Sequence, residues 1–359
     1  MELIPNLPND VALECLVRVK YDQIAALLPT CKGWKTQIEQ PEYFQLRKAS
    51  SHGQKLVVMA QARVDPDAKH GHQKGCSVKP IFRLSVLEPD TGKWVHFPAL
   101  PGEFHNGLPY FCHLVAVGCD LVLIGGLDPV TLEAIASVFV FNFLTAKWRR
   151  GADMPGVRRS LFGCASGDGA MVYVAGGHDE EKNALKSALV YDLVKDEWIP
   201  LPDMATERDE VKGVFRRGKF HAVGGYGTDT QGQFERTVQV FDVATWRWDH
   251  LQEDFLEAST CPNTCVSGAG NDMDIYMVNE GDVVAYKDAK WQVVAKLSAD
   301  VCNTVHVATW EDNLMVIGSP CFGEPYIAYV LNLKNYTWTR MEPADQYSGH
   351  VQSSCYLEL

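Results

Sequence analysis

The sequence lacks a long apolar run, a basic leader and any Cys-x-x-Cys pair, and each absence argues against a class of protein. No stretch of the 359 residues is long and apolar enough to span a bilayer. The N-terminal segment MELIPNLPND has neither the basic region nor the apolar core of a secretory signal peptide. We therefore expect a chain that stays in the cytoplasm or the nucleus and has no membrane partner.

Positive charge is also scarce, and the cysteines are odd in number. Lys and Arg total 33 against 45 Asp and Glu, which gives a net charge of −12. Nucleic-acid binders concentrate positive charge, so the sequence predicts no nucleic-acid partner. The eleven cysteines are expected to be free thiols, many of them buried, as in a reducing compartment. The length suits one large domain, or a large domain and a small one.

The common catalytic motifs are missing as well. The sequence has no GxxxxGK[ST], no HExxH, no GxSxG, and no GxGxxG after an expected strand. His70, His72 and Cys76 form the one tight cluster of metal-capable side chains, in a polar segment expected to be a loop. Three ligands fall short of the four that a zinc site needs. We therefore predict no metal, no cofactor and no catalytic residue.

A repeat, in contrast, is present. The segment MVYVAGGHDEEKNALKSALVYDLVKDEW (171–198) joins an apolar run, two glycines, a second apolar run and a tryptophan. Similar segments cover 120–148 and 219–248, and weaker copies end at Trp94, Trp291 and Trp338. Successive tryptophans lie 54, 50, 50, 43 and 47 residues apart. Self-similarity at this period indicates a repeat architecture.

Each repeat reads as four short strands separated by turn residues. In the clearest unit the expected strands are Leu161–Ala165, Met171–Ala175, Ala188–Asp192 and Glu197–Leu201. A four-stranded sheet buries neither face alone, and stacking such sheets around an axis gives a β-propeller. The glycines allow positive φ and close backbone approach, while the tryptophan fills space between blades with its N–H free to meet a carbonyl.

The count of repeats predicts six blades and the way in which the ring closes. Six units are present, but the opening strand of the first unit is missing before Lys55. A further strand signal remains at the C-terminus, in residues 350–359. We predict that it pairs with the blade at 55–100, so that residues 49–359 form a closed ring without a free edge.

These repeats resemble the kelch repeat. The best matches are Gly176-Gly177 with Tyr191-Asp192 and Trp198, and Gly224-Gly225 with Phe241-Asp242 and Trp248. Three units depart from the pattern, with Ala60-Gln61, Val278-Asn279 and Gly318-Ser319 where two glycines are expected. The resemblance implies an all-β, six-bladed kelch propeller.

The first 48 residues differ from the repeats and predict a small all-α module. Apolar residues recur at helical spacing, and Pro29 and Gly33 are expected to divide the segment into short helices. The order Leu7-Pro8, Leu16 and Cys31-Lys32-x-Trp34 resembles the F-box. An unrelated helical cap on the propeller, with Trp34 in its core, is the alternative. A module this small is expected to be partly covered by a partner.

The F-box resemblance implies docking on a Skp-type adaptor and, through it, on a cullin complex. The adaptor-facing residues would be Leu7, Pro8, Val11 and Leu16. Trp34 and Ile38 serve either the module's core or the interface.

The propeller loops are the expected site for a protein target. Loops between second and third strands and between blades should share one face. Arg and Tyr are common in binding hot spots. The candidates on this face are Arg158, Arg159, Arg208, Tyr226, Arg236 and Tyr326.

Together these resemblances imply the substrate-recognition subunit of a Skp-cullin-F-box ubiquitin ligase. Segments such as QARVDP (61–66) and GLDPVT (126–131) are similar to a plant subgroup that targets phenylalanine ammonia-lyase, and in some members type-B response regulators. Two alternatives stay open: a kelch scaffold without ubiquitin chemistry, and a metalloenzyme on a kelch ring.

Overall fold

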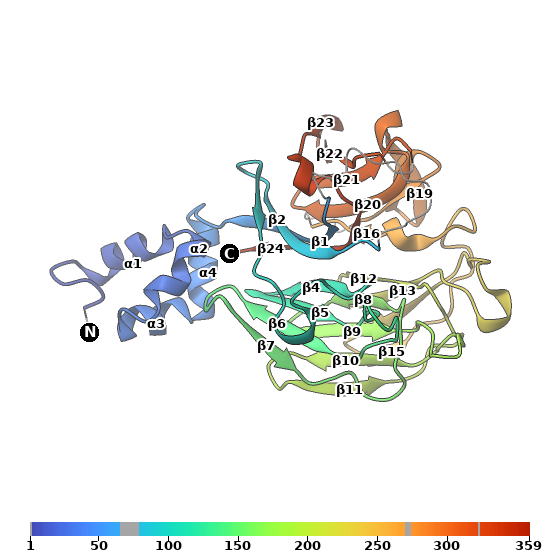
Figure 1. The fold of residues 1–359 in the computed structure, drawn as a ribbon, viewed down its shortest axis with the longest axis horizontal. Coiled ribbons are helices and arrows are strands. Elements are labelled where there is room, and N and C mark those ends of the chain that lie inside the picture. Colours follow the sequence, from blue (N-terminus) through green and yellow to red (C-terminus); the bar gives the residue numbers. More distant parts are fainter. Residues whose placement is uncertain (1, 65–78, 270–273, 322–323) are drawn as a thin grey trace.

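The computed structural model describes residues 2–64, 79–269, 274–321 and 324–359. Within these ranges four helices come first, and the strands that follow form six four-stranded sheets (Figure 1). The innermost strands contact one another in the order β4, β8, β12, β16, β20, β24 and back to β4. The expected six-bladed β-propeller is therefore confirmed. The four helices fit the expected F-box module.

The helices precede the first blade. They are α1 (Asn9–Val17), α2 (Tyr21–Leu27), α3 (Lys32–Ile38) and α4 (Pro41–Ala49).

The blades are numbered along the chain, and the innermost strand of each is given first. Blade 1 has β24 (Val351–Glu358), β1 (Lys55–Ala62), β2 (Phe82–Glu88) and β3 (Lys93–His96). Blade 2 has β4 (His113–Val117), β5 (Asp120–Ile124), β6 (Val138–Asn142) and β7 (Lys147–Gly151). Blade 3 has β8 (Gly163–Ser166), β9 (Met171–Ala175), β10 (Ala188–Asp192) and β11 (Glu197–Leu201).

The remaining three blades complete the ring. Blade 4 has β12 (Lys212–Arg216), β13 (Lys219–Val223), β14 (Val238–Asp242) and β15 (Arg247–Trp248). Blade 5 has β16 (Val266–Ser267), β17 (Ile275–Asn279), β18 (Asp282–Lys287) and β19 (Lys290–Lys296). Blade 6 has β20 (Asn303–Trp310), β21 (Asn313–Ser319), β22 (Ile327–Asn332) and β23 (Thr337–Met341).

The double glycine of blade 3 is required by two close backbone contacts. Gly176 and Gly177 have φ of 67° and 83°, a region that L-residues with a side chain rarely adopt. A Cβ on Gly177 would lie 2.4 Å from the carbonyl oxygen of Ser160, which precedes β8. A Cβ on Gly176 would lie 2.4 Å from the carbonyl oxygen of Arg208, which precedes β12 in the next blade. Gly177 therefore lets two loops of blade 3 approach each other, and Gly176 lets blade 3 approach blade 4.

Three of the six repeat tryptophans join their blade to the one before it through the indole N–H. The indole N–H of Trp198 donates to the carbonyl of Ala152 at 2.8 Å, just after the outermost strand of blade 2. Trp248 donates to Pro202 at 2.7 Å in the same way, and Trp291 donates to Phe255 at 2.6 Å. The expectation that the tryptophan N–H meets a carbonyl is confirmed at these three positions, whereas the buried indole N–H of Trp148 has no hydrogen-bond partner among the described residues.

The C-terminal strand takes the place of the missing first strand of blade 1. β24 pairs antiparallel with β1, with Val58 opposite Cys355 and Lys55 opposite Glu358. Gln61 stands where blades 2, 3 and 4 have a glycine, and its side chain is buried. The amide donates to the carbonyl of Gly349 at 3.1 Å and accepts from Ser85 Oγ at 2.8 Å, so a side chain bridges the gap here.

The helices pack around one apolar core and bury an arginine in it. Leu16, Ile24, Ile38 and Tyr43 lie in this core. Arg47 is 1% exposed and donates to the carbonyl of Val17 at 2.9 Å, which satisfies the C-terminal end of α1. The expected helix break at Gly33 was wrong, because Gly33 is the second residue of α3; the chain breaks between α2 and α3, around Pro29.

The helical module is attached to the propeller beside the C-terminus (Figure 1). The backbones of Gln54 and Leu359 exchange two hydrogen bonds, at 2.7 and 2.9 Å. Lys48 pairs with Glu358 at 2.7 Å. Leu144, from the turn after β6, is buried in the helical core. Apolar packing, an ion pair and backbone hydrogen bonds thus fix the module on blades 1 and 2.

Replacing Gly177 by Ala should lower the melting temperature clearly more than replacing Gly169 by Ala. Both glycines have positive φ, which costs a residue with a Cβ about 1–2 kcal/mol. Gly169 has open space around its missing Cβ, whereas Gly177 also faces the Ser160 carbonyl. The clash should add about 1–3 kcal/mol. Thermal unfolding of the two variants measures the difference, and equal losses would contradict the close-contact explanation.

Candidate protein-binding surfaces

The residues predicted to face an adaptor fall into two sets. Leu7 and Val11 are 36% and 44% exposed, and Pro8 between them is also exposed. Leu16 is only 3% exposed and Ile38 is fully buried, both within the helical core. Leu16 was therefore wrongly expected to face the adaptor, because its side chain fills the module. Ile38 belongs to the core.

Trp34 has a structural contact that orients the N-terminal segment. It is partly buried against the helical core, and its indole N–H donates to the carbonyl of Leu3 at 2.6 Å. A turn follows in which the Leu7 N–H donates to the carbonyl of Ile4 at 3.1 Å. Trp34 therefore holds the segment that presents Leu7 to solvent.

Two of the predicted substrate-face arginines are interior. Arg159 is 3% exposed and donates to the carbonyls of Gly176 and Ser187 at 3.1 and 3.0 Å. Burial lowers the pKa of Arg159 to about 10. Arg208 is fully buried and donates to Gly224 and to Thr237 Oγ1. Both were wrong as surface candidates, because each guanidinium holds a glycine turn and the following strand within its blade.

The other four candidates differ in exposure. Tyr226 is 5% exposed, and its hydroxyl donates to Glu210 at 3.0 Å, so it also lies inside. Tyr326 is half-buried beside the His350 ring. Arg236 pairs with Asp254 at 2.9 Å at the surface. Arg158 is exposed and, of the six, offers the most accessible charge.

Exposed apolar side chains occur in the β5–β6 loop of blade 2 and in the link to blade 3 that contains Arg158. Sequence reasoning missed them. Val130 and Leu132, in the loop between β5 and β6, are 83% and 50% exposed. Val157, beside Arg158 in the link to blade 3, is 52% exposed. The signal was available, because apolar residues inside loops rich in Pro, Gly and Asp are unusual. These residues and Arg158 form the candidate target surface of blades 2 and 3.

A serine, a histidine and an aspartate meet between blades 3 and 4. Ser160 Oγ lies 2.7 Å from His178 Nε2, and His178 Nδ1 lies 2.8 Å from Asp209 Oδ1. His178 follows the double glycine, while Ser160 and Asp209 each precede an innermost strand. Lys182 Nζ also approaches His178 Nε2, at 2.7 Å. Sequence reasoning missed this group because its members come from three separate loops.

The order of these groups is that of a nucleophile, a base and the residue that orients the base. Ser160 is 1% exposed, however, and His178 and Asp209 are each 4% exposed. A substrate cannot reach the serine hydroxyl while the two blades stay in contact. In this structure the three residues therefore tie blade 3 to blade 4.

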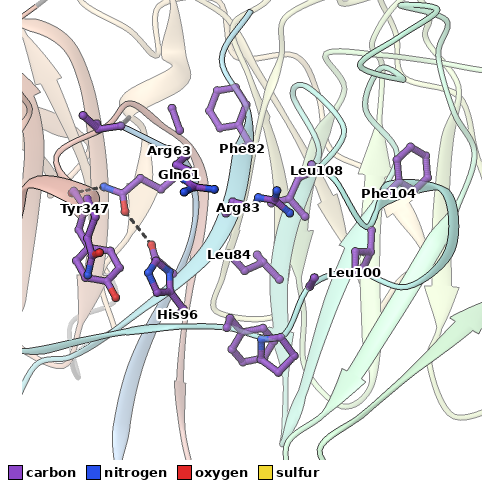
Figure 2. Close-up of a pocket in the computed structure, with 18 residues that line it drawn as sticks. Gln61, Arg63, Phe82, Arg83, Leu84, His96, Leu100, Phe104, Leu108 and Tyr347 are labelled. Carbon is purple, nitrogen blue, oxygen red and sulfur yellow. Dashed lines mark hydrogen bonds between the residues drawn. The ribbon is translucent and has the colours of Figure 1, made fainter. Parts of the chain in front are cut away.

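A cavity of about 380 Å³ lies beside blade 1 (Figure 2). Figure 2 shows Gln61 and Tyr347 on one side of it and Leu100 and Phe104 on the other. Two of its polar side chains already have partners: Gln61 is bonded as described above, and Arg83 donates to the carbonyl of His105 at 2.8 Å.

The possible metal cluster named from the sequence cannot be placed. His70, His72 and Cys76 lie outside the residues that the structure describes. Within the described ranges, no group of three or more His, Cys, Asp or Glu side chains is arranged to hold a metal ion. In the same ranges no helix has both the length and the apolar character to cross a membrane.

The fold and the helical extension define a kelch-type propeller with an N-terminal module, and known proteins share both. The family model for the Kelch motif matches residues 109–155 and 158–205, which contain blades 2 and 3. The solved structure of YjhT resembles this one with a TM-score of 0.57, covering 72% of this chain and 91% of that chain. Its 15% sequence identity supports the propeller fold alone.

Two Arabidopsis thaliana proteins are similar to the whole chain. The F-box/kelch-repeat proteins At1g80440 and At1g15670 are each 49% identical to it, over 366 and 360 aligned residues that cover both chains completely. A third, At2g44130 of the same plant, is 37% identical over 74% of this chain and 69% of its own. The chain belongs to the F-box/kelch-repeat family.

Replacing His178 by Leu should destabilise the propeller, because the buried Ser160 and Asp209 then lose their partner. Leaving a buried polar group unsatisfied costs about 1–3 kcal/mol, and more where it is charged. His250 is exposed, and His250→Leu is the matched control with little expected effect. Thermal unfolding checks the difference. A fluorophosphonate probe should leave native Ser160 unlabelled, and rapid labelling would contradict the inter-blade role.

Proposed function

We propose that this chain is the substrate-recognition subunit of a Skp-cullin-F-box ubiquitin ligase that acts in the cytoplasm or the nucleus. The helical module would bind a Skp-type adaptor and hence the cullin complex, and the propeller would bind a target protein. An associated enzyme would supply the ubiquitin chemistry. This chain would act by proximity, because tethering raises the effective concentration of the target's lysines.

The observation that carries the adaptor proposal is the exposure of Leu7 and Val11 in a module whose core is complete without them. Leu16, Ile38 and Tyr43 fill that core, so the two exposed apolar side chains have no structural task within the chain. Apolar side chains at the centre of an interface contribute strongly when a partner removes them from water. Family membership and the whole-chain identity to two F-box/kelch-repeat proteins support the same assignment.

The attachment of the module supports the proximity mechanism. Lys48 connects the helices to Glu358, the last residue of the closing strand, and Gln54 connects them to Leu359 directly after it. The aromatic ring of Tyr21 also packs against Phe143, with 6.1 Å between ring centroids. An adaptor on the module and a target on the propeller would therefore keep a fixed separation. Such geometry favours transfer to lysines in a defined region of the target.

For the target we propose phenylalanine ammonia-lyase isoforms, so that the chain would regulate phenylpropanoid biosynthesis. Type-B response regulators of cytokinin signalling are the second target class. The basis is the resemblance of the sequence to the plant subgroup that acts on these proteins. The candidate contact surface is the exposed group on blades 2 and 3, with Arg158 as its charge and Val130, Leu132 and Val157 as its apolar part.

Replacing Val11 by Asp should weaken binding of a plant Skp-type adaptor by about tenfold or more, because a charge would enter an apolar contact. Val194 is 83% exposed in the turn between β10 and β11, and Val194→Asp is the matched control. Calorimetry with the purified full chain and adaptor measures both affinities, and circular dichroism checks the helices. Unchanged affinity for Val11→Asp would refute the proposed adaptor surface.

Replacing Arg158 by Glu should reduce recovery of phenylalanine ammonia-lyase several-fold while the adaptor is retained. The test purifies tagged full chain from plant cells with the proteasome blocked and quantifies both proteins. Arg340 is exposed on β23, and Arg340→Glu controls for the change of charge. Adaptor without the lyase would refute this target, whereas lyase without adaptor would favour a kelch scaffold that has no ligase role.

A further inference from the structure

A channel of about 550 Å³ runs along the inside of the propeller ring. The residues that line it come from all six innermost strands or from the segments next to them. Each of these strands is hydrogen-bonded within its blade on one side only, so its other edge faces the channel. The volume lies within the range of small-molecule sites in proteins.

Lys212 brings a positive charge into this channel. It is the first residue of β12, and apart from Glu210 it is the only Asp, Glu, Lys or Arg among the described residues that line the channel. The Glu210 carboxylate already accepts a hydrogen bond from the Tyr226 hydroxyl. Within the described ranges, the Lys212 ammonium has neither a hydrogen-bond acceptor nor a carboxylate within ion-pair distance.

The titratable groups that face Lys212 do not balance its charge. Burial, with a smaller contribution from the nearby Lys212 charge, lowers the pKa of both His113 and His306 to about 3. These imidazoles are therefore neutral near pH 7. Burial raises the pKa of the Cys164 and Cys265 thiols to about 12, so they are neutral as well.

Two further groups lie nearby, and they leave the balance unchanged. Burial raises the pKa of the Cys261 thiol, which keeps it protonated. Burial lowers the pKa of His350, which keeps it uncharged near pH 7. The ammonium of Lys212 is thus surrounded by thiols and imidazoles that carry no negative charge.

Three other cations of the propeller are buried or partly buried, and all three have partners. Arg159 and Arg208 donate to backbone carbonyls, and Arg208 also lies 3.8 Å from Glu235. Arg216, on the same strand as Lys212, lies 3.7 Å from Asp274. Lys212 differs from these arginines, because its side chain is partly buried on the channel wall and has no such partner among the described residues. Its ammonium is therefore available to a partner that is not part of the chain.

We propose that the central channel binds a small oxyanion, a carboxylate or a phosphate, through the ammonium of Lys212. The anion would lie between β12 and the opposite innermost strands. The free strand edges around it supply backbone N–H donors, which commonly hold bound anions. The Ser354 hydroxyl, now 2.7 Å from His306 Nε2, is a further group within the channel. This site is independent of the proposed ligase role, because no adaptor or target contact enters the argument.

Binding should be coupled to proton uptake. Burial lowers the pKa of Lys212, whereas a bound anion would raise it by favouring the ammonium. Between these two pKa values the lysine gains a proton when the anion binds. Affinity should therefore fall as the pH rises through this interval.

The test uses the purified full chain with inorganic phosphate and with benzoate, each in its own titration. One of the two probes should raise the melting temperature by roughly 2 °C or more at saturation. Lys212→Met should abolish this response, while Lys212→Arg should retain it at least in part. Lys147 is exposed on β7, and Lys147→Met is the matched control with an unchanged response.

Calorimetry in buffers of different ionisation enthalpy then measures proton uptake, which the Met variant should lose. A response to benzoate alone assigns a carboxylate, a response to phosphate alone assigns a phosphate, and a response to both assigns a general oxyanion site. The proposal is overturned if neither probe stabilises the wild type, or if Lys212→Met responds as the wild type does.

Without any probe, the Met variant should be at least as stable as the wild type near pH 7, because it removes an unpaired charge. This difference should shrink as the pH rises toward the ordinary pKa of lysine, since the wild-type side chain then becomes neutral in the folded state. A large loss of stability in the Met variant would show instead that Lys212 has a structural role, and would also overturn the proposal.

Discussion

The pairing of β24 with β1 is the constraint on which the rest of the structure depends. It closes the ring, because without it blade 1 would lack its innermost strand. The same strand contributes Ser354 and Cys355 to the channel lining. Its end meets the helical module through Glu358 and Leu359. One strand therefore fixes the ring, the channel and the position of the helices together, and none of the three can form correctly without it.

The characteristic residues of the kelch repeat connect neighbouring strands and blades, and they are mostly buried. Arg159 holds the Gly176 turn, and Gly177 lies against the backbone of Ser160. His178 then connects Ser160 to Asp209 of the next blade. These residues of the repeat thus have structural roles, because their contacts hold the ring together. Under the proposed function, target recognition would fall to loop residues outside the repeat pattern, such as Val130 and Arg158.

This difference between repeat residues and loop residues explains how much of the structure the sequence alone could predict. Strands β9, β10 and β11 were predicted residue for residue, because alternating apolar residues, glycines and tryptophan are local signals. The orientation of Arg159 was not, because it depends on the carbonyls of a turn 17 residues away. Leu16 was misassigned for a related reason. A helix sequence shows which residues are apolar, but the burial of each depends on the helices packed against it.

The channel is the feature hardest to predict from the sequence, because its lining residues come together only when all six blades have assembled. Lys212, His113 and His306 belong to blades 4, 2 and 6, and no local pattern relates them. In blade 4, however, Asp209, Glu210 and Lys212 follow one another closely in the chain. One short segment therefore contains the Asp209 contact between blades, the Glu210 hydrogen bond to Tyr226 and the Lys212 charge in the channel. An anion bound at Lys212 would neutralise the positive charge of its ammonium, which no carboxylate of the described residues pairs with.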